Sequence, residues 1–297
     1  MWRRQFSPPT TTTMLGFPCL RRVDVLRTVQ LGQRRWITVS ARRLAETADG
    51  PAVTQTNKAE ATMKRFWKDV DVAERDGGYV VTLDRRALKT PSGNTLLLPR
   101  NKFAVASLIA AEWESQSTVL KPHALPITSL ASRAIDAFTN ATERAQVQKG
   151  LLDYLHTDTI CFHQDEPHQL VTLQKQHWDP LLDWARKTYG VDVRKAESLF
   201  SSTQPPETAD KLAKALDELD QWELASAFER ATHVTKSFLI ALALVKRCLN
   251  VEQAANAAHV EVNSQIQRWG EVEDTHDVDY HDVRRQLGSA ACLLMRV

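Results

Sequence analysis

Glycine is scarce in this sequence, and its placement excludes the common phosphate-binding loops. Only ten glycines occur among 297 residues, and none of them builds a GxGxxG or GxxxxGK(S/T) pattern. Both patterns hold phosphates against backbone N–H groups. The GxSxG turn that presents a nucleophilic serine is also missing. We therefore expect no nucleotide site, no catalytic residue and no cofactor.

Cysteine is also rare and scattered. The sequence contains four cysteines, none of them in a CxxC pair or at zinc-ligand spacing from a histidine: Cys19, Cys161, Cys248 and Cys292. Isolated thiols of this kind argue against a structural zinc site and against a disulfide framework. We expect no bound metal.

Long apolar runs are missing as well. The longest, Phe238–Val245, has eight residues and is flanked by Lys236 and Lys246. A helix that crosses a bilayer needs about 20 apolar residues. The run therefore predicts a helix buried in the protein core, and we expect no stable membrane insertion.

Charge is distributed unevenly along the chain. Residues 1–43 contain nine arginines, no lysine and one acidic residue, Asp24. Of the 38 basic and 36 acidic residues in total, the remaining chain keeps 29 and 35, a net charge of about −6. Nucleic acid is not an expected partner of such a body, because binding it requires a basic surface.

The first 43 residues have the composition of an organellar targeting sequence, rich in Arg, Ser and Thr and poor in acids. We interpret residues 1–43 as a mitochondrial presequence and expect the mature protein in the mitochondrial matrix. The small polar residues 44–61 predict a linker between this segment and the fold.

Strand patterns come first in the rest of the chain. Residues 79–83 alternate between apolar and polar side chains, and after Pro91–Asn94 the pattern returns with Leu96 and Leu98. This indicates an antiparallel hairpin, which an earlier strand within residues 66–75 would extend to a meander.

Helix patterns follow the strands. In the first helix we expect Phe103, Ser107 and Trp113 to share one stripe, together with Ala110. Pro180 would split a helix that ends at Gly190. Residues 222–249 would form one long helix, apolar all round at its centre, around which the others pack. Helices are predicted over residues 101–117, 127–138, 143–158, 167–190, 201–219, 222–249, 251–270 and 275–295.

The order of the patterns, strands before helices, indicates the α+β class. We predict a small N-terminal domain over residues 62–130, made of an antiparallel β-meander with a helix. A mostly helical C-terminal domain would then occupy residues 131–297.

The densest cluster of charge is WGEVEDTHDVDYHDV, residues 269–283, with six carboxylates and two imidazoles. On a helix, Glu273, Asp277 and His281 would share one face, where they could bind a divalent ion or supply a general base. The spacing is not HExxH, and the glycine of an EF-hand is missing. A metal-assisted hydrolase, a solvated helix and an acidic surface recognised by another protein all remain possible functions of this stretch.

A set of ordered motifs runs through the chain: KRFWKDV, LDRRALKTPSGNTLLLP, AAEWESQ, LPITSLASRAID, TDTICF, QKQHWDPLLDWARKTYGV and QRWGEVEDTHD. In this order they resemble the mitochondrial ATP synthase assembly factor 2 family, the chaperones of the ATP synthase alpha subunit. The resemblance covers roughly residues 63–290.

The resemblance implies a non-enzymatic, ATP-independent assembly chaperone. Its partner would be the unassembled alpha subunit of the catalytic head of ATP synthase, which it would keep from aggregating until the beta subunit takes its place. We expect the chaperone to act as a monomer. A structural subunit that stays in the finished complex is the alternative, beside the metal-assisted hydrolase.

The resemblance also implies roles for single residues. Glu273 occupies the last position of a WGxxE motif and is the first choice for binding the partner, followed by Glu271 and Asp274. Structural anchors are expected at five positions: Glu112, Trp113, Trp178, Trp269 and Gly270.

Overall fold

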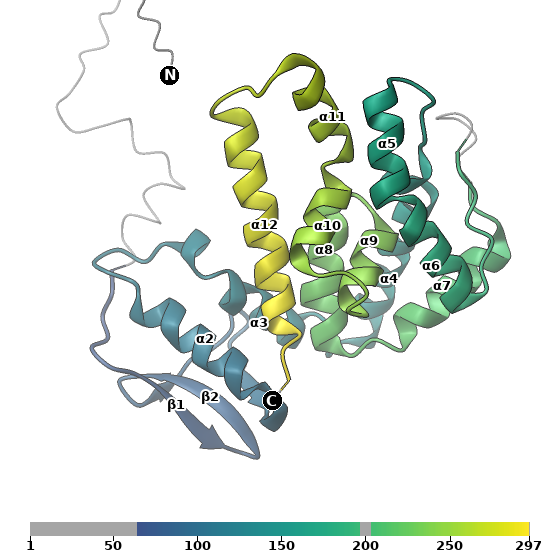
Figure 1. Ribbon diagram of the computed structural model, residues 1–297. Coiled ribbons are helices and arrows are strands. Elements are labelled where there is room, and N and C mark those ends of the chain that lie inside the picture. Colours follow the sequence, from purple (N-terminus) through teal and green to yellow (C-terminus); the bar gives the residue numbers. More distant parts are fainter. Residues whose placement is uncertain (1–63, 197–202, 297) are drawn as a thin grey trace, which may run out of the picture. The chain divides into compact units, whose positions relative to one another are not determined.

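The computed structural model describes residues 64–196 and 203–296, which belong to a single compact unit (Figure 1). The predicted presequence at residues 1–43 and the predicted linker at residues 44–61 lie outside the described residues. The domain boundary after residue 130 stays a prediction.

A four-stranded antiparallel sheet opens the described chain. Its strands are β1 (Val70–Arg75), β2 (Gly78–Leu83), β3 (Arg86–Ala87) and β4 (Leu97–Pro99), and β2 pairs with each of the others. The predicted hairpin and the earlier strand are therefore confirmed. Asp76 and Gly77 connect β1 to β2 with φ of 51° and 76°. Positive φ at both positions is what a two-residue type I′ hairpin requires.

Helix α2 (Phe103–Glu114) packs on the sheet, where it contacts β1, β2 and β4. Its buried side chains are Val105, Ala106 and Ile109, whereas Phe103 is 46% exposed. The predicted stripe through Phe103, Ser107, Ala110 and Trp113 is therefore wrong. Small residues on both sides of this helix weaken the apolar periodicity, so the sequence gives no clear choice of face.

Helices make up most of the remaining chain. Their bounds are α3 (Pro126–Asp136), α4 (Ala141–His156), α5 (His168–His177), α6 (Asp179–Tyr189), α7 (Pro206–Asp217), α8 (Glu229–Thr235), α9 (Phe238–Val245), α10 (Val251–Ala258), α11 (Val260–Trp269) and α12 (Thr275–Leu293). Short helical turns lie at η1 (Arg100–Lys102), η2 (Pro122–Ala124) and η3 (Thr159–Cys161), and η4 (Glu223–Phe228) is a π-helix.

The proline and glycine signals set several of these boundaries. Pro180 lies in the first turn of α6, directly after the end of α5, so the predicted split is confirmed. Gly190 ends α6 with φ of 61°, a conformation that glycine adopts without a steric penalty.

The single long helix predicted over residues 222–249 is wrong. The chain turns at Lys236, whose φ is 53°, and a new helix begins behind Ser237. The Ser237 hydroxyl accepts a hydrogen bond from the backbone N–H of Ile240 and so satisfies one of the free donors at the start of α9.

Helix α9 is the centre of the helical region, as predicted. All eight of its residues are buried, and it contacts η4 and helices α4, α6, α8 and α10. A helix enclosed on every side must be apolar around its whole circumference, which explains its sequence of Phe, Leu, Ile, Ala and Val.

Asp158 connects the start of α9 to η3 from a fully buried position. Its two carboxylate oxygens accept hydrogen bonds from the backbone N–H groups of Ile160, at 3.1 Å, and Leu239, at 2.9 Å. Burial raises the pKa of Asp158 to about 6, although these hydrogen bonds and one from Ser237 act in the opposite direction. The carboxylate thus caps two helical elements that are far apart in the sequence.

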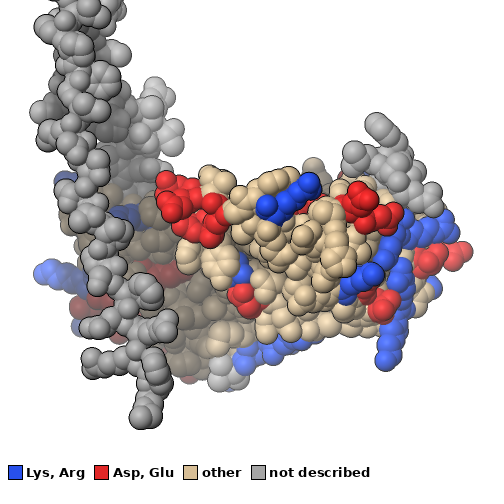
Figure 2. Space-filling model, turned by 45° about the horizontal axis from the view of Figure 1, so that its top comes forward, with Lys and Arg blue, Asp and Glu red and all other residues tan. Residues whose placement is uncertain are grey.

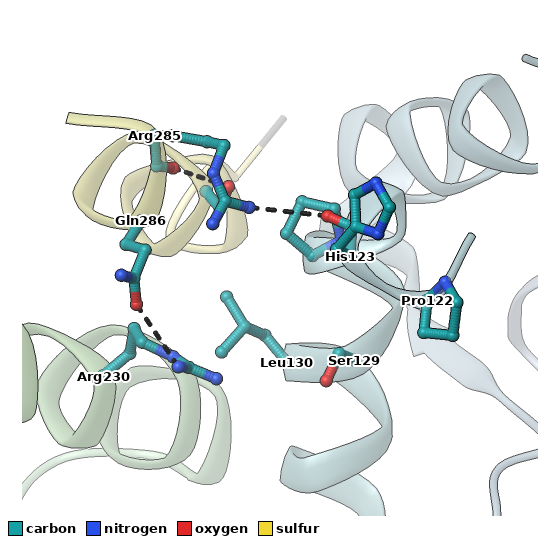
Figure 3. Close-up of a pocket in the computed structure, with 9 residues that line it drawn as sticks. Pro122, His123, Ser129, Leu130, Arg230, Arg285 and Gln286 are labelled. Atoms are coloured by element: carbon teal, nitrogen blue, oxygen red, sulfur yellow. Dashed lines mark hydrogen bonds between the residues drawn. The ribbon is translucent and has the colours of Figure 1, made fainter. Parts of the chain in front are cut away.

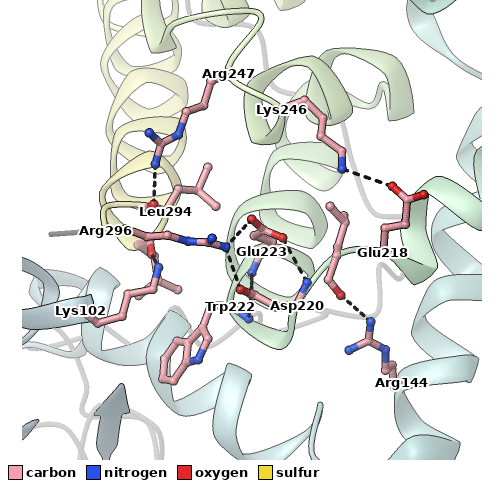
Figure 4. A network of polar contacts seen from close by, with 12 residues as sticks. Lys102, Arg144, Glu218, Asp220, Trp222, Glu223, Lys246, Arg247, Leu294 and Arg296 are labelled. Carbon is pink, nitrogen blue, oxygen red and sulfur yellow. Dashed lines mark hydrogen bonds and ion pairs between the residues drawn. The ribbon is translucent and has the colours of Figure 1, made fainter. Parts of the chain in front are cut away.

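The C-terminal end of α12 is held by cationic side chains (Figure 4). Lys102, which is buried, donates to the carbonyl oxygen of Leu293, and Arg247 donates to the following carbonyl at 2.9 Å. Arg296 lies just beyond and pairs with two carboxylates, Asp220 at 3.0 Å and Glu223 at 2.8 Å. Cationic side chains at this end donate hydrogen bonds to carbonyl groups that have no partner within the helix, and their charge is favourable next to the negative end of the helix dipole.

The α+β class predicted from the order of patterns is confirmed: an antiparallel sheet comes first and helices follow. Within residues 64–196 and 203–296, the helices are all too short or too polar to cross a membrane.

Candidate functional site

The acidic stretch forms the turn between α11 and α12. Helix α11 ends at Trp269, Gly270 follows with φ of 87°, and α12 begins at Thr275. Asp274 also has positive φ, 66°, so the chain is not helical before Thr275. Glu273 therefore lies in the turn and does not share a helical face with Asp277, contrary to the arrangement considered from the sequence.

A reciprocal pair of hydrogen bonds fixes the shape of this turn. The backbone N–H of Val272 donates to Nδ1 of His276 at 2.9 Å, and the N–H of His276 donates to the carbonyl oxygen of Val272 at 3.1 Å. One of the two imidazoles of the stretch thus has a structural role. The backbone N–H of Thr275 adds a further bond, to the carbonyl oxygen of Glu273 at 2.8 Å.

The metal-assisted reading of Glu273, Asp277 and His281 does not match the observed geometry. Across the described part of the chain, no three His, Cys, Asp or Glu side chains are grouped closely enough to bind a metal ion together. The offset of Glu273 from the helical face of Asp277 and His281 explains why these three do not converge.

Apolar side chains are exposed among the carboxylates of the turn. Trp269 is 70% exposed, Val272 58% and Val278 67%. The surrounding carboxylates are exposed as well. We call this surface the acidic knuckle, and define it as Trp269, Glu271, Val272, Glu273, Asp274, Asp277 and Val278. Figure 2, which brings the top of Figure 1 forward, shows acidic side chains gathered where the α11–α12 turn lies, next to uncharged surface.

Val272 and Val278 were not singled out from the sequence. The sequence does carry a signal for them: Val272 and Val278 are apolar residues that lie among the carboxylates of residues 271–279. Exposed apolar side chains that cluster and are rimmed by polar groups mark an interaction site more often than isolated ones do.

Trp269 differs from the structural anchor that we expected. With 70% of its surface exposed, it makes little contact with the core, and the Arg268 guanidinium lies 5.0 Å from its ring centroid. Trp269 is the last residue of α11 and lies directly before the exposed turn that begins at Gly270. Gly270, by contrast, lies where positive φ is needed to turn the chain.

Glu112 and Trp113 join α2 to the start of α3. The Glu112 carboxylate accepts hydrogen bonds from the backbone N–H groups of Ile127, at 2.7 Å, and Thr128, at 2.9 Å. The Trp113 indole donates to the Thr128 hydroxyl at 3.1 Å and lies edge-on to Trp67. Burial raises the pKa of Glu112, while the bonds from Thr128 and Ile127 lower it. Both side chains thus connect two helices at a distance from the knuckle.

Trp178 lies between α5 and α6 and is fully buried. Its indole N–H donates to the carbonyl oxygen of Ala257 at 2.8 Å, which ties this junction to α10. A buried indole needs such a partner, because an unpaired N–H in the core is costly.

A cavity of about 200 Å³ lies between α3, α8 and α12 (Figure 3). Arg285 donates to the carbonyl oxygen of His123 at 3.5 Å and to the carboxylate of Asp282 at 2.6 Å. Arg230 donates to the side chain of Gln286 at 3.4 Å. Because these guanidinium groups already join neighbouring elements, we assign this cavity to helix packing and the candidate site to the acidic knuckle.

Comparison with known proteins gives one consistent family. The family model described as ATP12 chaperone protein matches residues 64–186. The mitochondrial protein atp12 of Schizosaccharomyces pombe is 35% identical, over 79% of this chain and 83% of that protein. The mitochondrial protein ATP12 of Saccharomyces cerevisiae is 28% identical, over 92% of this chain and 98% of that protein.

A solved structure extends the similarity to the fold. The crystal structure of Atp12 from Paracoccus denitrificans is 28% identical and superposes with a TM-score of 0.69, covering 79% of this chain and 98% of that one. The resemblance seen in the ordered motifs is thus confirmed, and the family is one of chaperones, not of enzymes. By its sequence and its fold, the chain belongs to the ATP12 chaperone family.

Proposed function

We propose that this chaperone assembles ATP synthase by binding the unassembled alpha subunit of the catalytic head through the acidic knuckle. It would keep that subunit from aggregating until the beta subunit takes its place, without using ATP. The proposal rests on the exposure of Trp269, Val272 and Val278 in a stretch whose carboxylates are exposed as well.

The physical reason is that a subunit awaiting assembly exposes apolar surface that its partner will later cover. A transient cover lowers the concentration of the aggregation-prone form by mass action. The cover must also be displaced by the beta subunit, which favours a small contact in which a few apolar residues are surrounded by charge.

The carboxylates of the knuckle would supply selectivity and a fast encounter. Glu273, Glu271 and Asp274 are the partner-binding residues that we propose, and all three are exposed. Opposite charges across an interface steer association and reject partners of the same charge. Trp269 would then serve as an apolar contact of the same surface.

The proposed compartment is the mitochondrial matrix. Two relatives are named mitochondrial, and residues 1–43 have the arginine-rich, acid-poor composition of a targeting sequence. The matrix is where a chaperone of the soluble catalytic head would meet its client.

A charge reversal at the knuckle tests the proposed function. We expect Glu273→Lys to weaken binding of purified alpha subunit by about tenfold or more, because the new cation would repel the basic groups of the partner that the carboxylates attract. The fold should be preserved, since exposed substitutions usually change stability by less than about 0.5 kcal/mol.

The matched control is Asp210→Lys, which reverses an exposed carboxylate on α7. It should bind the alpha subunit as the unmodified protein does, measured by biolayer interferometry with circular dichroism as the check of folding. Equal binding by both variants would refute the role of Glu273.

A further inference from the structure

A groove opens between α5 and α11, directly beside the acidic knuckle. It has a volume of about 310 Å³, and Trp269 belongs to both surfaces. The groove is lined by Pro167, Leu170, Ser264, Gln265, Arg268 and Trp269, among others. None of these positions except Trp269 was singled out in the sequence, because the two walls are about 100 residues apart.

The floor and the rim of the groove differ in character. Leu170 and Ser264 form a buried floor, with 6% and 4% of their surface exposed. Gln265 and Trp269 stand at the rim and are exposed. A concave site with a buried floor and an aromatic wall is the form in which protein interfaces receive one deeply buried side chain.

Charge around the groove favours a basic neighbour on the partner. Arg268 is the cation that the groove itself contributes, and its guanidinium lies over the ring of Trp269, 5.0 Å from the centroid. Glu261 also lines the groove, and Glu271 and Glu273 follow within a few residues of Trp269. The carboxylates thus outnumber the one arginine at this edge.

We propose that the α5–α11 groove receives one large apolar side chain of the client, while the acidic knuckle pairs with a lysine or arginine next to it in the client sequence. This inference rests on the proposed binding of the alpha subunit at the knuckle and adds the chemistry of the bound segment. The groove supplies the buried contact, and the knuckle supplies charge complementarity at its rim.

Two tryptophan substitutions on α11 distinguish the effect of filling the groove from the effect of a bulky residue elsewhere on the helix. Gln265 lines the groove and Gln267 does not, yet both are exposed glutamines of the same helix. Gln265→Trp should fill the groove and weaken binding of purified alpha subunit by about tenfold or more, whereas Gln267→Trp should stay within about twofold of the unmodified protein.

A second variant tests the groove in case Gln265→Trp does not fold. Trp269→Ala removes the aromatic wall without filling the groove and should also weaken binding by about tenfold. Normal binding by both Gln265→Trp and Trp269→Ala would overturn the groove and the apolar contact proposed for Trp269, whereas the binding through Glu273 is tested separately by Glu273→Lys. An unmodified protein that does not bind the alpha subunit would overturn both.

The class of bound segment is tested with overlapping 15-residue peptides that tile the alpha subunit. Peptides that bind the unmodified protein should carry a large apolar residue within two positions of a lysine or arginine, and their binding should be lost in Gln265→Trp. Preferential binding of acidic peptides, or peptide binding that is unchanged in Gln265→Trp, would contradict the inference.

Discussion

At the scale of single residues, Trp178 and Trp269 show that the same residue type has opposite surroundings in this fold. Trp178 is fully buried with a hydrogen-bonded indole, and Trp269 is 70% exposed. Both follow helical segments of similar composition, so the local sequence does not distinguish them. The difference lies in their tertiary positions: Trp178 is enclosed at the α5–α6 junction and bonded to α10, whereas Trp269 is the last residue of α11, before an exposed turn.

Alanine substitution should separate the two tryptophans. We expect Trp178→Ala to lower the free energy of unfolding by about 3–5 kcal/mol, since it leaves a large cavity in the core. Trp269→Ala should change it by less than about 0.5 kcal/mol. Urea denaturation of both variants measures the difference. A similar loss of stability in both would mean that Trp269 is packed in solution.

Asp158 predicts a pH dependence of stability. Its pKa is raised from 3.8 to about 6 on folding, so between these values the folded protein binds more protons than the unfolded chain. The stability that this group contributes is therefore fully present below about pH 4 and is lost as the pH rises through about 6. A shift of this size corresponds to roughly 3 kcal/mol.

The substitution Asp158→Asn should remove this pH-dependent contribution to stability, because the amide does not titrate. The free energy of unfolding of the unmodified protein, minus that of Asp158→Asn, should fall by about 2 kcal/mol between pH 4 and pH 7. Chemical denaturation across this range measures it. A difference that stays constant or rises with pH would show that the carboxylate is not protonated in the folded state near pH 5.

At the scale of elements, the helix break marked by proline could be predicted, and the break at Lys236 was missed. Pro180 and Gly190 are local signals with a steric cause, and the structure follows them. Lys236, where the chain turns with positive φ, is itself no signal for a break, because lysine is a good helix former. The sequence Thr-Lys-Ser before an apolar run contained a capping serine that could have indicated the break.

Ser237 should make a measurable contribution to the start of α9. Its hydroxyl accepts from the N–H of Ile240 at 3.1 Å in a fully buried position. We expect Ser237→Ala to lower the free energy of unfolding by about 1–2 kcal/mol, the usual effect of losing an N-cap. Ser117→Ala, at an exposed position outside the helices, is the control and should stay within about 0.5 kcal/mol. Equal effects in urea denaturation would exclude a capping role.

At the scale of the whole molecule, the candidate site could be predicted only in part. The carboxylates of residues 271–277 are adjacent in the sequence, so their exposure as one acidic surface follows from composition. The groove beside them could not be predicted, because Leu170 and Ser264 meet only through the packing of α5 on α11. Local patterns report faces of single elements and contain no information on which elements become neighbours.

A photo-crosslinker placed at Val272 tests whether the acidic knuckle binds the alpha subunit. Val272 is 58% exposed at the centre of the knuckle, and Lys149, exposed on α4, is the control position. We predict crosslinks to the alpha subunit from position 272 that decrease when the beta subunit is added, and none from position 149. Crosslinks from position 149 with none from position 272 would show that the alpha subunit binds elsewhere than at the acidic knuckle.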